Sequence, residues 1–406
     1  MKNLTKKSPS LSTCLSPWLL DPATVFLNHG SFGACPKPVL DAQQEWRLRL
    51  ERQPVHFMVR ELEPLLAHAA SKLASFLNCN PCDLAWVPNA THGINAVLRS
   101  LSFEPGDELL VTNQAYNATR NAVEFAAASG GARVVVAQLP FPVNRIEDLV
   151  QPILVAASPR TRLAILDHVT SQTAMVLPLE RCVRELKTRG VDTLVDGAHA
   201  PGMVSLNLRK IGAAYYTGNC HKWLCAPKGA AFLHVSPSVQ NRIRPLAISH
   251  GANSTRTDLS RFQLEFGWTG TSDPSAWLSV PTALEFMGNL LPGGWPDLMA
   301  KNRDLALHAR SRIALALGCQ PPCPADCVGS MASLPLPPAP SHALPRLPRN
   351  EFPLQDSLRE KHRIEVPVIA WPSPPHRVVR ISAQFYNRPE QYDLLASALV
   401  EELRTL

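Results

Sequence analysis

The sequence predicts an α/β protein with a mainly parallel sheet in a large domain, followed by a smaller α+β domain. Two observations support this fold class. Up to residue 234, short apolar runs of strand length alternate with segments whose apolar residues recur at helical spacing, which is typical of βα units and a parallel sheet. After residue 234 this alternation ends, and the end of the chain has a helix–strand–strand–helix pattern. The 406 residues suffice for two domains.

We expect an N-terminal arm at residues 1–25, the large domain at 26–290 and the small domain at 291–406. The arm begins with basic residues, and Ser and Pro interrupt its apolar part, so we interpret it as a disordered lead-in and not as a signal peptide. No apolar run approaches the roughly 18 residues that a membrane span needs. These features favour a cytoplasmic protein without membrane contact.

The expected elements follow from the same periodicity and from the Gly, Pro and Asn residues that bound them. In the large domain, strands are expected at 84–87, 108–112, 133–137, 162–166, 193–195, 213–216 and 230–233. Helices are expected there at 39–53, 61–77, 94–101, 118–128, 146–157, 178–189 and 275–291. The end of the chain is expected to form helices at 296–317, 353–362 and 389–404, with strands at 329–335, 364–370 and 377–383.

Charge and cysteine usage exclude some classes of function. The net charge of +7 is spread along the chain without a long basic run, which argues against a nucleic-acid-binding face. Ten cysteines are scattered, and no second C-x-x-C motif or His pair completes a metal site with Cys79 and Cys82. We therefore expect reduced, isolated thiols and no bound metal.

The stretch 191–233 contains the most informative pair of residues. One apolar run ends in Asp196, and the next leads to Lys222. In an open α/β sheet, the carboxyl ends of strands line the ligand crevice. A lysine amine can form a Schiff base with an aldehyde cofactor, and pyridoxal phosphate needs a carboxylate at its ring nitrogen. Spacing alone still favours the alternative of a turn Asp and a solvated Lys.

The wider sequence resembles the pyridoxal-phosphate enzymes of the class V aminotransferase fold, in particular the branch around isopenicillin N epimerase and the cysteine-derived C–S lyases. The resemblance implies the type I fold of these enzymes and pyridoxal 5′-phosphate as cofactor. The motifs that carry it are FLNHGSFGACP (26–36), PNATHGINAVL (88–98), TNQAYNATRNA (112–122), LDHVTSQTAMVLP (166–178), DGAHAPG (196–202), TGNCHKWLCAPKG (217–229), GWTGTSDPSAWL (267–278) and VVRISAQFYN (378–387).

The same resemblance implies roles for individual residues. Lys222 would bind the cofactor and act as general base, with Lys228 as the rival lysine, and Asp196 and His199 would complete the catalytic set. Further cofactor contacts are implied for Thr91, His92, Tyr116, His168, Ser171, Thr217, Asn219, His221 and Thr271. Substrate contacts are implied for Asn28, His29 and Arg380, whose guanidinium fork matches a carboxylate. Structural alternatives remain for several of them: Thr91 as a helix N-cap, Tyr116 as a core or surface residue, and His168 as a buried structural histidine.

One departure from the family limits the chemistry. Cysteine desulfurases of this class carry a nucleophilic cysteine shortly before the substrate-binding arginine, whereas residues 365–380 here contain none. We therefore expect Cα deprotonation of an amino acid, as in an epimerase. β-Elimination by a C–S lyase is the alternative; an aminotransferase is less favoured, and a non-catalytic protein that binds pyridoxal phosphate or a partner is least favoured. The turn at 270–271 reaches the partner's cofactor in the family, which implies a homodimer.

Overall fold

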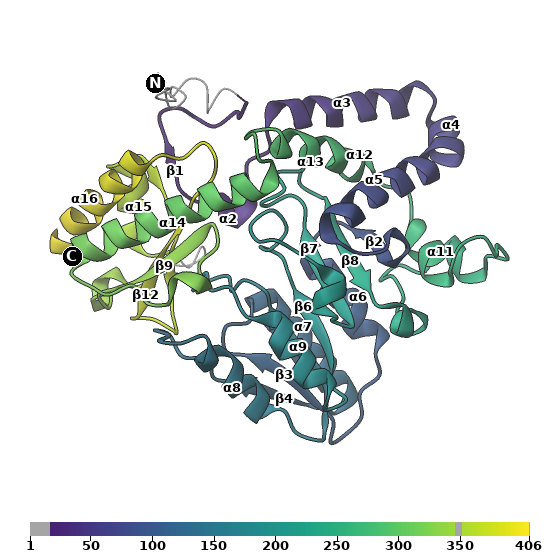
Figure 1. Cartoon of the computed structure of the whole chain (residues 1–406), viewed down its shortest axis with the longest axis horizontal. Coiled ribbons are helices and arrows are strands. Elements are labelled where there is room, and N and C mark those ends of the chain that lie inside the picture. Colours follow the sequence, from purple (N-terminus) through teal and green to yellow (C-terminus); the bar gives the residue numbers. More distant parts are fainter. Residues whose placement is uncertain (1–16, 346–350, 406) are drawn as a thin grey trace, which may run out of the picture.

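The computed structural model describes residues 17–345 and 351–405, and a seven-stranded sheet forms the centre of this part of the chain (Figure 1). The strand order is β2-β8-β7-β6-β5-β3-β4, and β8 alone runs against its neighbours. The predicted α/β fold with a mainly parallel sheet is therefore confirmed. The strands are β2 (Leu84–Val87), β3 (Glu108–Thr112), β4 (Arg133–Ala137), β5 (Thr161–Asp167), β6 (Asp192–Asp196), β7 (Tyr215–Asn219) and β8 (Ala231–Val235).

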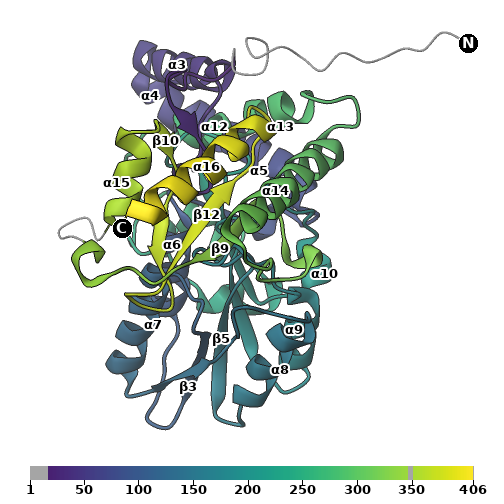
Figure 2. The same ribbon diagram turned by 90° about the vertical axis from the view of Figure 1, so that its left-hand side faces the viewer.

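Helices cover both faces of this sheet, and alternate residues of each strand point to opposite faces. In β3, Leu109 and Val111 belong to the core under α6 (Ala90–Ser100) and α7 (Asn117–Gly130). Leu110 belongs to the core under α8 (Glu147–Ala156) and α9 (Leu179–Lys187). Figure 2 shows α7 on one side of β3 and β5, and α8 and α9 on the other. Each fully buried side chain of this size stabilises the fold by about 1.5–3 kcal/mol.

A second, three-stranded antiparallel sheet lies beside the first, in the order β11-β12-β9. Helices α14, α15 and α16 gather around it (Figure 2). The strand expected at 364–370 is split into two short strands, because Pro367 has no N–H for a ladder hydrogen bond. The expected domain boundary at 290 stays a prediction. The elements here are β9 (Met331–Leu336), β10 (Ile364–Glu365), β11 (Val368–Ala370), β12 (Arg377–Ser382), α14 (Trp295–Leu317), α15 (Pro353–Glu360) and α16 (Pro389–Thr405).

Most of the remaining helices are grouped in the upper right of Figure 1, near the edge strand β2. The single helix expected at 275–291 is divided, and its second part begins where Pro281 occupies the first turn. The helices are α2 (His29–Phe32), α3 (Lys37–Arg52), α4 (Pro54–His56), α5 (Leu62–Leu77), α10 (Leu208–Ile211), α11 (Arg261–Gly267), α12 (Ser275–Leu278) and α13 (Val280–Gly288).

The described part of the N-terminal arm is packed against the end of the chain, which differs from the disordered lead-in that we expected. Trp18 is buried among the rings of Phe286, Phe385 and Tyr386. Strand β1 (Val25–Phe26) pairs in parallel with β10. Apolar burial and ladder hydrogen bonds therefore order this segment. Residues 1–16 of the arm lie outside the described residues.

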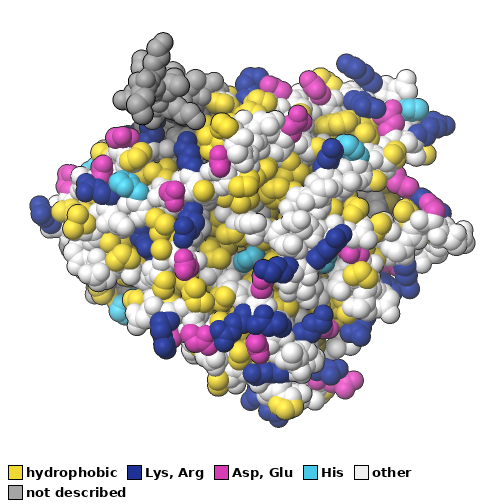
Figure 3. Space-filling model, viewed as in Figure 1, with side chains coloured by type: hydrophobic (Ala, Val, Ile, Leu, Met, Phe, Trp, Pro, Cys, Tyr) yellow, Lys and Arg dark blue, Asp and Glu magenta, His cyan; other side chains and the backbone are white. Residues whose placement is uncertain are grey.

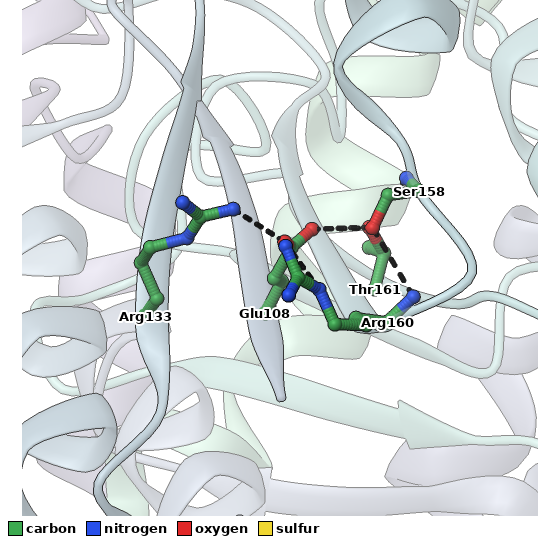
Figure 4. A network of polar contacts seen from close by, with 5 residues as sticks. All are labelled: Glu108, Arg133, Ser158, Arg160 and Thr161. Carbon is green, nitrogen blue, oxygen red and sulfur yellow. Dashed lines mark hydrogen bonds and ion pairs between the residues drawn. The ribbon is translucent and has the colours of Figure 1, made fainter. Parts of the chain in front are cut away.

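A polar network at the amino end of β3 joins three neighbouring segments of the sheet (Figure 4). The buried carboxylate of Glu108 lies 2.6 Å from Arg133 and 3.0 Å from Arg160, and it accepts the Ser158 hydroxyl at 2.7 Å. The Ser158 hydrogen bond, and then Arg133, hold the pKa of Glu108 below its usual value. The network therefore stabilises the sheet at the edge where its parallel strands begin.

The surface, the helices and the cysteines can be compared with what the sequence predicts about charge, membrane spans and thiols. On the face in Figure 3, Lys and Arg side chains lie among Asp and Glu side chains. Within the described ranges, no helix has the length and apolar character needed to cross a membrane. The nine described cysteines are all free, and Cys14 lies outside the described residues.

Candidate active site

The candidate site lies where β5, β6 and β7 end and α6 begins. Asp196 is the last residue of β6, and it points to the face of the sheet that α6 and α7 cover. Its buried carboxylate accepts the Thr119 hydroxyl at 2.7 Å and the Ala198 N–H at 3.1 Å. Among the described residues, no Lys or Arg forms an ion pair with it. A buried carboxylate that lacks a cationic partner is suited to bind a protonated ring nitrogen.

Lys222 follows β7, and its Nζ lies 3.1 Å from Nε2 of His199. Burial, and then the charge of Arg380, lower the pKa of Lys222 to about 7, whereas the Asp196 charge acts in the opposite direction. Burial likewise lowers the pKa of His199 well below its usual value, and Nδ1 of this ring has no hydrogen-bond partner among the described residues. The site therefore contains an amine that titrates near pH 7 and a ring nitrogen without a hydrogen-bond partner among the described residues.

His29 fixes the main chain of Lys222. The Ala34 N–H donates to Nδ1 of His29 at 3.3 Å, so Nδ1 is the acceptor nitrogen and Nε2 carries the proton. Nε2 then donates to the Lys222 carbonyl at 3.1 Å, and the Tyr386 hydroxyl donates to Nδ1 at 2.8 Å. The ring is fully buried with both nitrogens engaged. This geometry favours Asn28 over His29 for a substrate contact.

Lys228 has a structural contact instead of a place in the site. Its Nζ donates to the carbonyl of Gly33. Gly33 has φ 65°, and a Cβ there would lie 2.6 Å from the carbonyl oxygen of His221. Only glycine combines this backbone angle with such a close approach. The contact holds the N-terminal turn against the lysine loop, and it favours Lys222 over Lys228 as the reactive amine.

Arg380 is a buried residue of β12 that reaches the site from the second sheet. Nη1 donates to the Ser171 carbonyl at 2.7 Å, and Nη2 donates to the Ser31 hydroxyl at 2.8 Å. Its Nε has no partner, and no carboxylate forms an ion pair with it within the described part of the chain. Burial lowers the pKa of Arg380 to about 10. An uncompensated buried guanidinium is a site for an anionic group.

The start of α6 provides N–H groups for a second anion. The structure corrects the expected helix start at 94, because Asn89 is the N-cap and Thr91 is already the second helical residue. The Asn219 side chain accepts the Ala90 N–H at 2.8 Å, and no described group accepts the N–H of Thr91. Gly93 permits close packing, since a Cβ there would lie 2.3 Å from Thr217 Oγ1. A helix start with a free N–H suits a phosphate.

Several predicted contacts lie around this centre. Tyr116 precedes α7, is 45% exposed, and lies close enough to Arg380 for an electrostatic interaction. His92 lies in the first turn of α6, and burial lowers its pKa. Ser171 contacts Arg380 through its carbonyl. Tyr116 and Ser171 thus approach Arg380 from two separate loops, whereas His92 belongs to helix α6.

Other predicted contacts have partners that favour a structural role. The Thr217 hydroxyl donates to the carbonyl of Phe232 and is fully buried. Nδ1 of His168 lies 2.8 Å from the Tyr216 hydroxyl, and burial lowers the pKa of His168 to about 4. Nδ1 of His221 lies 2.9 Å from the carbonyl of Ala230. Cofactor contact through the other ring nitrogen of these histidines stays a prediction.

Thr271 has no hydrogen bond or ion pair to the other predicted site residues within the described part of the chain. It lies in an exposed turn, and a Cβ at its neighbour Gly270, whose φ is 119°, would meet no atom within 4 Å. The turn is therefore open to solvent in one chain.

The sequence did not predict two residues that contact the site, Thr119 and Ser31. Thr119 binds Asp196, and Ser31 binds Arg380. Both lie in motifs that were recognised, three residues after Tyr116 and Asn28 respectively. The spacing of one helical turn was a signal that could have found Thr119.

Comparison with known proteins decides the family. The sequence profile described as Aminotransferase class-V matches residues 25–395. The chain belongs to the class-V aminotransferase family. It is 36% identical to an isopenicillin N epimerase of Amycolatopsis lactamdurans over 94% of this chain and 96% of that protein. It is 33% identical to a probable chloroplastic L-cysteine desulfhydrase of Arabidopsis thaliana, over 93% of this chain and 83% of that protein.

A solved structure supports the fold of this class-V chain. A mutant of the cystine C–S lyase C-DES, with glycine covalently linked to its pyridoxal phosphate, superposes with a TM-score of 0.79 and 21% identity. The match covers 97% of this chain and all of that one. The predicted type I fold is confirmed, and the class-V family gives pyridoxal 5′-phosphate as the cofactor. The unsatisfied Nδ1 of His199, the free Thr91 N–H and the Asp196 carboxylate fit that group.

Proposed function

We propose that this enzyme removes the Cα proton of an amino acid and returns a proton to the opposite face, as an epimerase or racemase does. The observation that carries the proposal is the neutral-capable amine of Lys222 close to the unpaired guanidinium of Arg380. An amine with a pKa near the working pH is an effective general base. A guanidinium without a carboxylate partner suits the α-carboxylate of the substrate.

Some of these residues would bind the cofactor, and Arg380 would bind the substrate. Lys222, Asp196, His199 and the start of α6 would hold pyridoxal phosphate. When bound, that cofactor withdraws electrons from Cα and so acidifies its proton. Arg380 would bind the α-carboxylate, which leaves the Cα–H bond facing Lys222, and correct orientation of this kind is worth several kcal/mol. Lys222 Nζ would then accept the proton.

Deuterium exchange tests the proposal. The holoenzyme is incubated in deuterated water with a panel of L-amino acids, and the products are analysed by mass spectrometry and chiral chromatography. Cα deuterium together with the D-epimer is expected. If a keto acid accepts an amino group and no exchange occurs with any amino acid, the protein is an aminotransferase and the proposal is wrong.

β-Elimination from a cysteine derivative is the second candidate. The observation in its favour is the similar identity to epimerases and to desulfhydrases over nearly the whole chain. Near Lys222, Cys35 and Cys225 are buried, and burial raises the pKa of Cys35 to about 12 and that of Cys225 further still. Such thiols are poor nucleophiles, so we expect elimination to proceed without a persulfide on the protein. Release of pyruvate, ammonia and a sulfur product from a cysteine S-conjugate would favour it.

We also propose a homodimer that completes each site with the turn of its partner. The turn at Gly270 and Thr271 supports this assembly, because both residues are exposed and a Cβ at Gly270 would meet no atom of the described residues within 4 Å. Sedimentation measures the state directly, and a fully active monomer would contradict the proposal.

A further inference from the structure

A series of hydrogen bonds connects Arg380 to Glu365 through Ser31 and Asn28. The Arg380 Nη2 donates to Ser31 Oγ at 2.8 Å, and the Ser31 hydroxyl donates to Asn28 Oδ1 at 2.5 Å. The Asn28 Nδ2 donates to Glu365 Oε1 at 3.0 Å. Arg380 Nη2 also lies 3.5 Å from Asn28 Oδ1. Glu365 therefore connects to the candidate carboxylate site although it belongs to β10.

Chemistry fixes the direction of every bond in this series. A guanidinium has donors only, so Ser31 Oγ accepts from Arg380. A carboxylate only accepts, so Glu365 takes the NH₂ group of Asn28 and leaves Oδ1 to accept the Ser31 hydroxyl. With the amide reversed, the NH₂ group would face two donors. Because the two ends of an amide have nearly the same shape, the acceptor beyond it decides which end faces the arginine.

Glu365 does not act as a counter-ion. It forms no ion pair with Arg380, and none of the charges that shift the pKa of Arg380 is that of Glu365. Its main chain holds the same segment, since the Leu27 N–H donates to the Glu365 carbonyl at 2.9 Å and Phe26 is its register partner. The backbone and the side chain of Glu365 thus both bind the loop that carries Asn28.

We infer that Glu365 is a positioning residue for substrate binding: through Asn28 and Ser31 it holds the Arg380 guanidinium in the orientation that receives the substrate carboxylate. The inference rests on the proposed role of Arg380. A misplaced guanidinium binds the carboxylate more weakly, so KM rises. Because the Cα–H bond then also faces Lys222 less well, kcat should fall and not rise. One hydrogen bond of this kind corresponds to about a fivefold change.

The test compares Glu365→Ala with Glu365→Gln in the holoenzyme. Steady-state KM and kcat are measured for the best amino-acid substrate, and the inhibition constant of propionate reports carboxylate binding without catalysis. Glu365→Ala should raise both KM and that inhibition constant about fivefold. Glu365→Gln should restore both, because its amide oxygen can accept the same bond. Glu360, whose side chain is 70% exposed on the neighbouring helix, provides the control Glu360→Ala.

A double-mutant cycle with Asn28→Ala tests whether Glu365 acts through Asn28. Glu365→Ala should add nothing in the Asn28→Ala background. Wild-type values for Glu365→Ala, equal damage from Ala and Gln, or multiplying effects in the double variant would each overturn the inference. Cofactor absorbance and thermal unfolding verify that the variants are folded. An Arg380→Ala variant with unchanged KM and propionate inhibition would instead reject the proposed role of Arg380 itself.

Discussion

Replacing Arg380 with glutamine should raise the pKa of Lys222. The structure gives the size of the pKa shift in the wild type. Burial and Arg380 lower the pKa of Lys222 from 10.5 to about 7. At pH 7, half of such an amine is neutral, against roughly one part in 3,000 for an ordinary lysine, which is a gain of roughly 1,500-fold in reactive amine. Arg380→Gln removes the positive charge, so the pKa of Lys222 should rise and its neutral fraction at pH 7 should fall.

Competitive acetylation of the cofactor-free protein measures this pKa directly. A trace of acetic anhydride is added between pH 5 and pH 11, and mass spectrometry gives the modification of Lys222 relative to the exposed Lys37. A midpoint near pH 7 is expected in the wild type, with a higher midpoint in Arg380→Gln. A wild-type midpoint above pH 9, or a lower midpoint in the variant, would refute the electrostatic reasoning.

Three other predictions concern separate parts of the molecule. Asp196→Asn should retain pyridoxal phosphate, seen by its absorbance, but lose roughly 10²–10³ in turnover, because a preorganised charge at the ring nitrogen is gone; near-normal turnover would reject the role. Glu108→Gln should lower the free energy of unfolding by roughly 2 kcal/mol at pH 7 in urea titrations. Because the folded pKa of Glu108 is depressed, the contribution of its carboxylate is present above the unfolded pKa and is lost as the pH falls through the folded pKa, so the difference should vanish in acid. Mixed Lys222→Ala and Thr271→Ala subunits should form hybrids with one intact site and regain activity, whereas mixtures that stay inactive would argue against shared sites.

The sequence predicted best those elements that clear turn residues bound on both sides. Strands β3 and β4 have the predicted bounds, since their apolar runs end at clear turn residues. The strand expected at 213–216 starts two residues and ends three residues before the observed β7: Gly218 and Asn219 indicate a turn locally, yet hydrogen bonds to β8 keep them in the sheet. Gly93 indicated a break before α6, although it is helical and permits contact with β7. In each case a tertiary contact outweighs the local preference.

Site residues inside motifs were predictable, and their partners were not. Asp196 is the last residue of β6 and Lys222 follows β7, so the rule that strand ends line the ligand crevice predicts both positions. The bond between Asn28 and Glu365 joins positions 337 residues apart, and no periodic pattern reports such a contact. Glu365 also follows an isoleucine in a two-residue strand, which is too short for an alternation signal.

The pairing of β1 with β10 has a consequence for how the protein is made. Phe26 leaves the ribosome long before its partner Glu365, and at about 5–20 residues per second the interval is roughly 20–70 s. During that time the large sheet can assemble, but the segment carrying Asn28 and Ser31 has no strand to join, and Lys222 lacks Tyr386 behind His29. Closing such a distant contact is slow in folding. The carboxylate site can therefore form only after Glu365 and Arg380 have been synthesised, when this C-terminal segment binds the N-terminal segment that carries Asn28 and Ser31.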